Sequence, residues 1–427
     1  MVRDGCKYTE LGPIPEDWDT AAFRDCFDTL PNNTLSRAEL NDRGGTVKNI
    51  HYGDVLVRFP AVLDCRREEL PYDNPEWAPR LSAAFLRDGD VVIADTAEDS
   101  TVGKAVEIAG TEGRRVVSGL HTIPCRPRRK ELFAPKWLGY FMNHRAYHDQ
   151  LLPFITGTKV SAISRSAIAD TVIAIPGRAE QERVVEALSD VDGLIDGLER
   201  LIAKKRDVRR AAAGELLSGR LEPGGGDSAA RYKIGETGVF YTGLTGKTKA
   251  DFGHGEARYI TFLNVLENEI VDMSILERVD VSRNESQNAV RPGDLFFNTS
   301  SETPEEVGMC AVLLDEADRV FLNSFCFGFR LEEPGIDPLF ASYYFNGQEG
   351  RKIMRVLAQG ATRFNLSKAN FQEVEVAFPP YERQREIAGV LRCMDREIDA
   401  LRAEVRKYRQ IRSGMMDDLL TGRVRLR

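Results

Sequence analysis

The segment IPGRAEQERVVEALSDVDGLIDGLERLI, residues 175–202, has a counterpart at residues 378–405, FPPYERQREIAGVLRCMDREIDALRAEV. In both segments, apolar residues recur at alternating steps of four and three after a proline-containing start. This spacing averages 3.5 residues, the heptad period of helices that pack along a shared seam. The predicted seam residues are Val184, Leu188, Val191, Ile195, Leu198 and Ile202 in the first segment, and Ile387, Leu391, Met394, Ile398, Leu401 and Val405 in the second.

A heptad seam needs a partner helix, because its narrow apolar stripe is exposed when the helix stands alone. One such segment could also lie as an amphipathic helix on its own domain. Two copies in one chain favour the other arrangement, in which each helix is the partner of the other. The sequence therefore predicts an intramolecular coiled coil.

The two helices belong to a tandem duplication of the chain. With an offset of 203 residues, as from Pro135 to Pro338, the two copies run without a gap as far as the endings LLSGRL and LLTGRV. Upstream, with small insertions, DGDVVIADTAEDSTVGKAV (residues 88–106) matches PGDLFFNTSSETPEEVGMCAV (residues 292–312). Each half thus has a variable N-terminal part, which we call its front, and a C-terminal part that is similar in the two halves.

The fronts contain short runs rich in Val, Ile, Phe and Tyr, separated by Gly, Asn and Asp turns. They predict an α+β fold in which two mixed α/β domains stand in tandem, each followed by a long helix. The predicted boundaries are residues 1–178 for the first domain, 179–222 for its helix, 223–231 for a linker, 232–380 for the second domain and 381–423 for its helix.

Composition limits the class of protein. The net charge of −8 over 427 residues excludes binding to nucleic acid through bulk positive charge, although local basic patches remain compatible with it. The 7 cysteines are scattered, with no CxxC pair, and no apolar run approaches the length of a membrane span. We expect a cytoplasmic protein without a metal site.

The stretch GLTGKTKADFGHGE, residues 243–256, resembles cofactor loops only in part. A phosphate loop requires GxxxxGK[ST], and the position of its first glycine is taken by Tyr241. The glycines also suggest a methyltransferase loop, but FPPYE (residues 378–382) offers no Asn or Asp before its prolines. The sequence therefore predicts neither a nucleotide site nor catalytic methyl transfer in this chain.

Side chains for acid–base or nucleophilic catalysis do not form a recognisable set. His144 and His148 lie four residues apart on an expected helix, but no carboxylate or cysteine completes a metal-binding motif there. The GxSxG motif of serine hydrolases is absent from the sequence. We expect no catalytic residues.

Basic and hydrogen-bonding residues instead gather in the variable fronts, where they are candidates for contacts with DNA phosphates and base edges. TGTKVS (residues 156–161) and GATRFN (residues 360–365) carry the most weight, because they occupy matching places in the two halves. The candidates are Lys48, Asn49, His51, Lys159, Lys247, Lys249, His254, Arg258, Tyr259, Asn298, Thr299, Thr362, Arg363 and Asn365.

This organisation resembles the specificity subunit of type I restriction-modification systems, known as the S subunit or HsdS family. The likeness rests on the two variable domains, the related helices that begin near EQ or RQ, and the endings LLSGRL and LLTGRV. The stretch LGPIPEDW, residues 11–18, is similar to the opening typical of the family, whereas the second half has RYKIGETGVFYTG in that place.

The resemblance implies a non-catalytic DNA reader that serves in defence against foreign DNA. Each variable domain would be a target-recognition domain for one part of a split, asymmetric DNA sequence, and the helices would pair antiparallel as a spacer. Two adenine-N6 methyltransferase (M) subunits and the restriction (R) subunits would dock on the chain. S-adenosylmethionine, ATP and Mg²⁺ would be bound by those partners, and this chain would hold no cofactor.

Two other interpretations stay open at the level of sequence. The chain is also compatible with a coiled-coil interaction scaffold that binds no DNA. Alternatively, it is the DNA reader of another methylation or defence complex.

Overall fold

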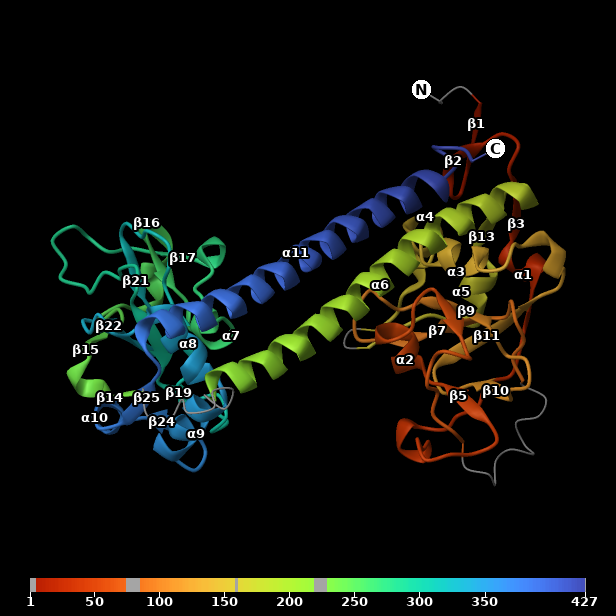
Figure 1. Cartoon of the computed structure of the whole chain (residues 1–427). Helices are drawn as coiled ribbons and strands as arrows, with labels where there is room; N and C mark the ends of the chain where they lie inside the picture. Colours follow the sequence, from red (N-terminus) through yellow and green to blue (C-terminus); the bar gives the residue numbers. More distant parts are fainter. Residues whose placement is uncertain (1–4, 74–84, 158–159, 219–228, 427) are drawn as a thin grey trace. The chain divides into compact units, whose positions relative to one another are not determined.

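The computed structural model describes residues 5–73, 85–157, 160–218 and 229–426 (Figure 1). The chain divides into two compact units: unit 1 is formed by Met1–Leu198 with Glu404–Arg427, and unit 2 by Glu199–Ala403. Each unit therefore contains one front domain, the start of the long helix that follows it, and the end of the long helix from the other half.

Unit 1 is built around a five-stranded sheet, ordered β4 (Phe27–Thr29), β11 (Thr122–Pro127), β7 (Val91–Ala94), β9 (Ala105–Ala109) and β6 (Val62–Asp64). Four strand pairs surround it: β1 (Cys6–Thr9) with β2 (Gly12–Pro15), β3 (Asp19–Ala22) with β13 (Val172–Ile175), β5 (Lys48–Ile50) with β10 (Val116–Ser118), and β8 (Thr96–Ala97) with β12 (Ser161–Ala162). Its short helices are α1 (Phe23–Cys26), α2 (Tyr52–Val57), α3 (Trp137–Met142), α4 (Arg145–His148) and α5 (Arg165–Ala169).

Unit 2 has a four-stranded sheet, ordered β15 (Gly238–Thr242), β22 (Cys326–Leu331), β18 (Leu295–Asn298) and β20 (Cys310–Val312). The remaining strands form the sheets β17 (Glu277–Val279), β16 (Phe252–Ile260) and β21 (Val320–Leu322); β19 (Ser300–Ser301), β24 (Phe364–Leu366) and β23 (Ala358–Gln359); and β14 (Ala230–Lys233) with β25 (Glu375–Phe378). Its short helices are α7 (Phe262–Glu267), α8 (Pro338–Asn346), α9 (Gln348–Leu357) and α10 (Lys368–Gln372).

The duplication seen in the sequence is also a duplication of strand pairing. The parallel pair β5–β10 corresponds to β16–β21, and the antiparallel pairs β8–β12 and β3–β13 correspond to β19–β24 and β14–β25. The strand β14 begins at Ala230, within the range predicted as a linker, and residues 219–228 lie outside the described part of the chain. The two units thus repeat one framework.

The long helices α6 (Arg178–Leu217) and α11 (Tyr381–Leu419) follow the two front domains, which confirms the predicted fold class. A fully buried glutamine anchors the start of each helix. The Gln181 side chain accepts from the backbone of Ala134 and donates to the carbonyl of Pro176. Gln384 makes the equivalent bonds to Asp337 and Pro379, so the glutamine of the EQ and RQ motifs fixes where each helix leaves its domain.

In each unit, the start of one long helix lies antiparallel to the end of the other. In unit 1, Arg183 on α6 donates to the backbone of Leu426, and Asp192 farther along α6 binds Arg412 on α11. In unit 2, Lys205 pairs with Glu397 at 2.6 Å and Arg209 pairs with Asp395 at 2.9 Å. In both units the positions advance along one helix as they recede along the other, as the family resemblance predicts.

A tyrosine from each front domain completes these helix contacts. The Tyr140 hydroxyl donates to Asp192 at 2.7 Å, and the Tyr343 hydroxyl donates to Asp395, also at 2.7 Å. Tyr140, Asp192 and Arg412 in unit 1 therefore have the same arrangement as Tyr343, Asp395 and Arg209 in unit 2; we call each set a Tyr–Asp–Arg triad. The triad joins a front domain to both long helices.

The predicted seam residues and the ends of the long helices lie inside the units. Every one of the twelve predicted seam residues is buried or half-buried. The buried residues Met416, Leu419 and Leu420 join the core of unit 1, while Ala213 joins the core of unit 2. Each core is thus completed by a segment of the other half of the sequence.

Two hairpin glycines repeat a backbone geometry that positions a candidate DNA-contacting loop in each unit. Gly157 has a φ of +110° and Gly360 a φ of +141°, values that L-residues rarely adopt. A Cβ atom at either position would overlap a backbone carbonyl oxygen, that of Val160 or of Arg363. The loops at TGTKVS and GATRFN therefore require glycine at the same place.

No helix among the described residues combines the length and the apolar character needed to cross a membrane.

The contribution of the end of α11 to unit 1 can be measured with Leu420→Ala, because Leu420 directly follows the last residue of this helix. Leu420 is 1% exposed in the unit 1 core, so its truncation should lower the free energy of unfolding by about 2–5 kcal/mol. The control is Leu194→Ala, because Leu194 lies on α6 with 42% of its surface exposed, and it should cost below about 1 kcal/mol. Urea unfolding of both variants checks this; equal losses would contradict the role assigned to the helix end.

The strained hairpin can be tested with Gly360→Ala. The substitution should impose a strain of about 1–3 kcal/mol and accelerate amide exchange in β23 and β24 by roughly tenfold or more. Gly389→Ala is the matched control, because Gly389 lies in α11 with open space around its Cα. Hydrogen–deuterium exchange on peptides spanning residues 358–366 gives the readout. Unchanged exchange in Gly360→Ala would contradict the proposed constraint.

Candidate nucleic-acid interface

The first candidate surface is a matched strand that leads into a short helix. Lys48 begins β5 and pairs with Val116, while Arg258 pairs with Val320 at the equivalent place in β16. Both candidates are cationic. Lys48 is half-buried with its ammonium 5.4 Å from the centre of the Tyr72 ring, whereas Arg258 is exposed. The two halves thus present a cation at the same position in the fold.

Four candidates are engaged inside the fold, which removes them from the set of exposed reading residues. Fully buried Asn49 donates to Asp73 at 2.9 Å, and burial raises the pKa of that carboxyl. His51 caps α2 by accepting from the backbone of Gly53, and burial lowers its pKa.

Tyr259 and Asn298 have comparable structural contacts. The Tyr259 hydroxyl donates to Glu277 at 2.6 Å, and burial raises the pKa of the phenol. The Asn298 amide is fully buried, donates to the carbonyl of Glu306 and accepts from the backbone of Met309. The sequence indicated these residues only by their amino-acid type. Type does not distinguish a side chain that makes buried structural hydrogen bonds from one that is exposed for contact with DNA.

The stretch GLTGKTKADFGHGE folds as a capped turn that enters a strand, which is not the strand–loop–helix of a nucleotide site. Thr248 and Asp251 form reciprocal capping bonds, and β16 begins directly afterwards at Phe252. Lys247 pairs with Glu285 at 2.6 Å with only 10% of its side chain exposed. Lys249 and His254 remain exposed on this loop.

The matched hairpins contain the remaining candidates. Thr362, Arg363 and Asn365 are exposed on the loop and strand that follow Gly360. Asn365 pairs in register with Ser300 of β19, which places the hairpin beside the half-buried candidate Thr299. In unit 1, the bridge between Thr156 and Ala162 closes the equivalent hairpin. Lys159 lies outside the described residues.

Beside each hairpin lies a turn that sequence reasoning missed. The backbone of Asp95 donates to the carbonyl of His121 at 3.1 Å, and that of Thr299 donates to the carbonyl of Phe325 at 3.0 Å. These bonds make His121 and Phe325 structural equivalents. Both are exposed, and the His121 backbone adopts a φ of +55°. The sequence contains no signal for them, because a histidine and a phenylalanine differ in hydrogen bonding and charge and belong to no shared motif here.

A cation follows each hairpin at the start of a short helix. Arg165 begins α5 after the cap Ser164, and Lys368 begins α10 after the cap Ser367. Arg165 also donates to Asn32 at 3.1 Å, and the Asn32 amide donates to the carbonyl of Gly119 at 3.1 Å. The 203-residue offset could have found this pair, since both residues are basic.

These residues define what we call the exposed edge of each unit. The exposed edge of unit 1 comprises the exposed residues His121 and Arg165 together with the half-buried Asn32, Asp95 and Thr96. The exposed edge of unit 2 comprises the exposed residues Phe325, Arg363 and Asn365 together with the half-buried Thr299 and Lys368. In unit 1, Thr96 and Asp95 lie 3.3 Å and 3.5 Å from Nδ1 of His121, so hydrogen-bonding groups are concentrated at one point.

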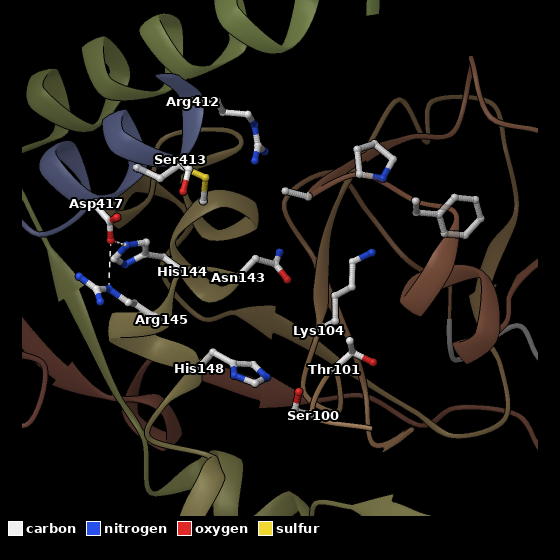
Figure 2. Close-up of a pocket in the computed structure, with 14 residues that line it drawn as sticks. Ser100, Thr101, Lys104, Asn143, His144, Arg145, His148, Arg412, Ser413 and Asp417 are labelled. Atoms are coloured by element: carbon white, nitrogen blue, oxygen red, sulfur yellow. Dashed lines mark hydrogen bonds and ion pairs between the residues drawn. The ribbon is translucent and has the colours of Figure 1, made fainter. Parts of the chain in front are cut away.

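A second feature is a pocket of about 660 Å³ in unit 1, beside the end of α11 (Figure 2). Figure 2 shows His144 and Arg145 directed at Asp417, at 3.1 Å and 3.0 Å. Burial lowers the pKa of His144, and Lys104 donates to the backbone of Leu56 at 2.9 Å. These polar side chains of the pocket thus form hydrogen bonds and ion pairs that hold the fold. They do not form a pair of a nucleophile and a base.

Unit 2 has a pocket of about 380 Å³ in the corresponding place, lined by Arg209 and Asp395 of its triad. Arg209 also forms an ion pair with Glu269 at 2.5 Å, so the positive charge of this arginine is neutralised within the pocket. Among the residues that the structure describes, no group of three or more His, Cys, Asp or Glu side chains is arranged to hold a metal ion.

Comparison with known proteins relates this architecture to one family. Residues 264–407 match the family model described as the type I restriction modification DNA specificity domain. A Methanocaldococcus jannaschii protein, named provisionally as the type I restriction enzyme MjaX specificity subunit, is 20% identical over 441 residues, covering 100% of this chain and 98% of that protein. The MjaVIII specificity subunit from the same organism is 21% identical over 219 residues, covering 50% of this chain and 49% of that subunit.

Solved structures show the same fold. The type I restriction-modification S subunit of M. genitalium has a TM-score of 0.56 at 13% identity, covering 98% of this chain and 97% of that chain. A chain from a structural study of assembly and conformational transition of the type I system has a TM-score of 0.57 at 16% identity, covering 96% and 99%. The family model and the relative that matches over its full length are both type I restriction-modification specificity proteins, which confirms the resemblance seen in the sequence.

Proposed function

We propose that the chain reads a bipartite, asymmetric DNA sequence, one part with the exposed edge of each unit. The observation that carries this proposal is one framework repeated with unlike side chains at matched positions of the two exposed edges. His121 corresponds to Phe325, and Asp95 corresponds to Thr299. A repeated framework supports equivalent docking of the two units, while different side chains select different bases.

Exposed cations support the proposal because phosphate contacts supply most of the affinity for DNA. Arg165 in unit 1 and Arg258, Lys249 and Arg363 in unit 2 are exposed, and the half-buried Lys368 adds a further positive charge to the exposed edge of unit 2. The chain as a whole is acidic, with a net charge of −8. Local cations and partner subunits would therefore share the phosphate contacts.

We further propose that the chain is a non-catalytic subunit that docks two adenine-N6 methyltransferase subunits and the restriction subunits in the cytoplasm. Two identical partners need two similar surfaces, and the duplicated Tyr–Asp–Arg triads with their neighbouring pockets supply a matched pair. S-adenosylmethionine, ATP and Mg²⁺ would be held by those partners.

The direct test is selection of duplexes from a random pool by the chain purified together with its methyltransferase subunits. The expected result is enrichment of one sequence with two specified parts separated by an unspecified spacer. Mapping methylated adenines in the host genome with and without this gene should identify the same sequence. Binding without sequence selection would contradict the proposal and favour an interaction scaffold.

A second experiment tests the division of the target between the units. Arg363→Gln should lower affinity for the selected duplex by about 5–150-fold, the effect of about 1–3 kcal/mol, and alter only the part of the target read by unit 2. Arg396→Gln is the matched control, because Arg396 is exposed on α11, away from the exposed edge. Competition binding at fixed moderate salt provides the measurement. Equal behaviour of the two variants would remove Arg363 from the interface.

A further inference from the structure

We propose that Phe325 recognises the 5-methyl group of a thymine in the part of the DNA target read by unit 2. This inference rests on the proposed function and adds a specificity-determining residue to it. It assigns an apolar contact to unit 2 at the position where unit 1 carries hydrogen-bonding groups.

The first observation is the exposure of Phe325. Its ring is 57% exposed, whereas Cys326 and Phe327, the next two residues, are 2% and 1% exposed. Phe327 and Phe329 continue along β22 into the unit 2 core. Phe325 lies just before this strand, on the turn that follows β21, so the framework presents its ring at the surface.

The second observation is the fixed backbone of this turn. The Phe325 N–H donates to Oδ1 of Asn323 at 2.8 Å. Its carbonyl accepts from both the backbone and the hydroxyl of Thr299, at 3.0 Å and 2.8 Å. Three hydrogen bonds therefore hold the residue that carries the ring. A backbone that is already ordered loses little conformational freedom on binding, which favours a specific contact by the side chain that it carries.

The third observation is the polar and cationic surroundings. Thr299 accepts through its carbonyl from the backbone of Leu366 at 2.8 Å, which brings the hairpin against the turn. Exposed Arg363 and Asn365 lie on that hairpin, and Lys368 begins the next helix. An exposed ring with cationic and amide side chains nearby is better suited to bind a nucleic acid than to bind the apolar surface of another protein.

Base chemistry then selects the ligand. In the major groove, thymine is the base that presents a methyl group, and an apolar side chain such as Phe contacts it favourably. In unit 1, the equivalent His121 lies within 3.5 Å of Asp95 and close to Thr96, so that position favours hydrogen bonding. A requirement for thymine methyl at this position should therefore be confined to the unit 2 part of the target.

Deoxyuridine provides the test, because it pairs as thymine does but lacks the methyl group. Each thymine in the selected duplex is replaced in turn, and affinity is measured for the chain in complex with its methyltransferase subunits. For the wild type, one replacement in the unit 2 part should lower affinity on the order of fourfold, the effect of one methyl-sized contact. Phe325→Ala should bind the thymine duplex more weakly and lose sensitivity to that replacement.

Two further variants make the result specific. Phe325→Leu keeps an apolar side chain and should retain part of the sensitivity to deoxyuridine. Val390→Ala is the matched control, since Val390 is 46% exposed in unit 2 but lies on α11. It should behave as the wild type. Thermal unfolding of each variant confirms that the turn has not lost its structure.

The outcomes separate the inference from the proposed function. If the wild type selects a target but no thymine replacement in the unit 2 part matters, or Phe325→Ala remains sensitive, the inference is overturned alone. A third outcome is that Phe325→Ala binds more weakly while the wild type does not distinguish thymine from deoxyuridine. This would indicate that the ring stacks on a base or inserts between bases, and it would also overturn the inference. If the wild type selects no sequence, both the proposed function and the inference are overturned.

Discussion

The antiparallel return of each long helix onto the front domain of the other half is the contact on which the rest of the structure depends. In unit 1, Asp192 receives a hydrogen bond from Tyr140 and binds Arg412; in unit 2, Tyr343, Asp395 and Arg209 repeat the arrangement. Each aspartate is satisfied by a domain tyrosine and by an arginine of the opposite helix, so removal of either partner would leave a partly buried carboxylate underpaired.

This interdependence explains why the duplicated halves of the sequence do not coincide with the compact units. Unit 1 ends its core with Leu419 and Leu420, more than two hundred residues after its front domain ends, and unit 2 takes Ala213 from the first helix. The repeated framework is therefore fixed by long-range packing. Exposed turns outside that packing, such as those of His121 and Phe325, are free to carry different chemistry.

The fold was largely predictable from patterns that the packing imposes on the sequence. The heptad spacing, the matched prolines and the repeated endings indicated two front domains with paired helices, and the glutamines of EQ and RQ proved to be buried anchors. Individual contact residues were less predictable. Asn49 and Asn298 have the side chains of base readers but are buried braces, whereas Phe325 has the side chain of a core residue and is exposed.

The sequence by itself determined the duplication, the helix seams and the resemblance to one family, because periodic apolar residues and repeated motifs are local properties of the chain. Only the tertiary structure decided which polar side chains face outward and which distant positions are equivalent. A side chain's environment depends on strand pairing across long separations, as when Thr299 fixes the turn of Phe325. Residue type alone does not specify that pairing. For this reason the residues of the exposed edges could be identified only in the folded chain.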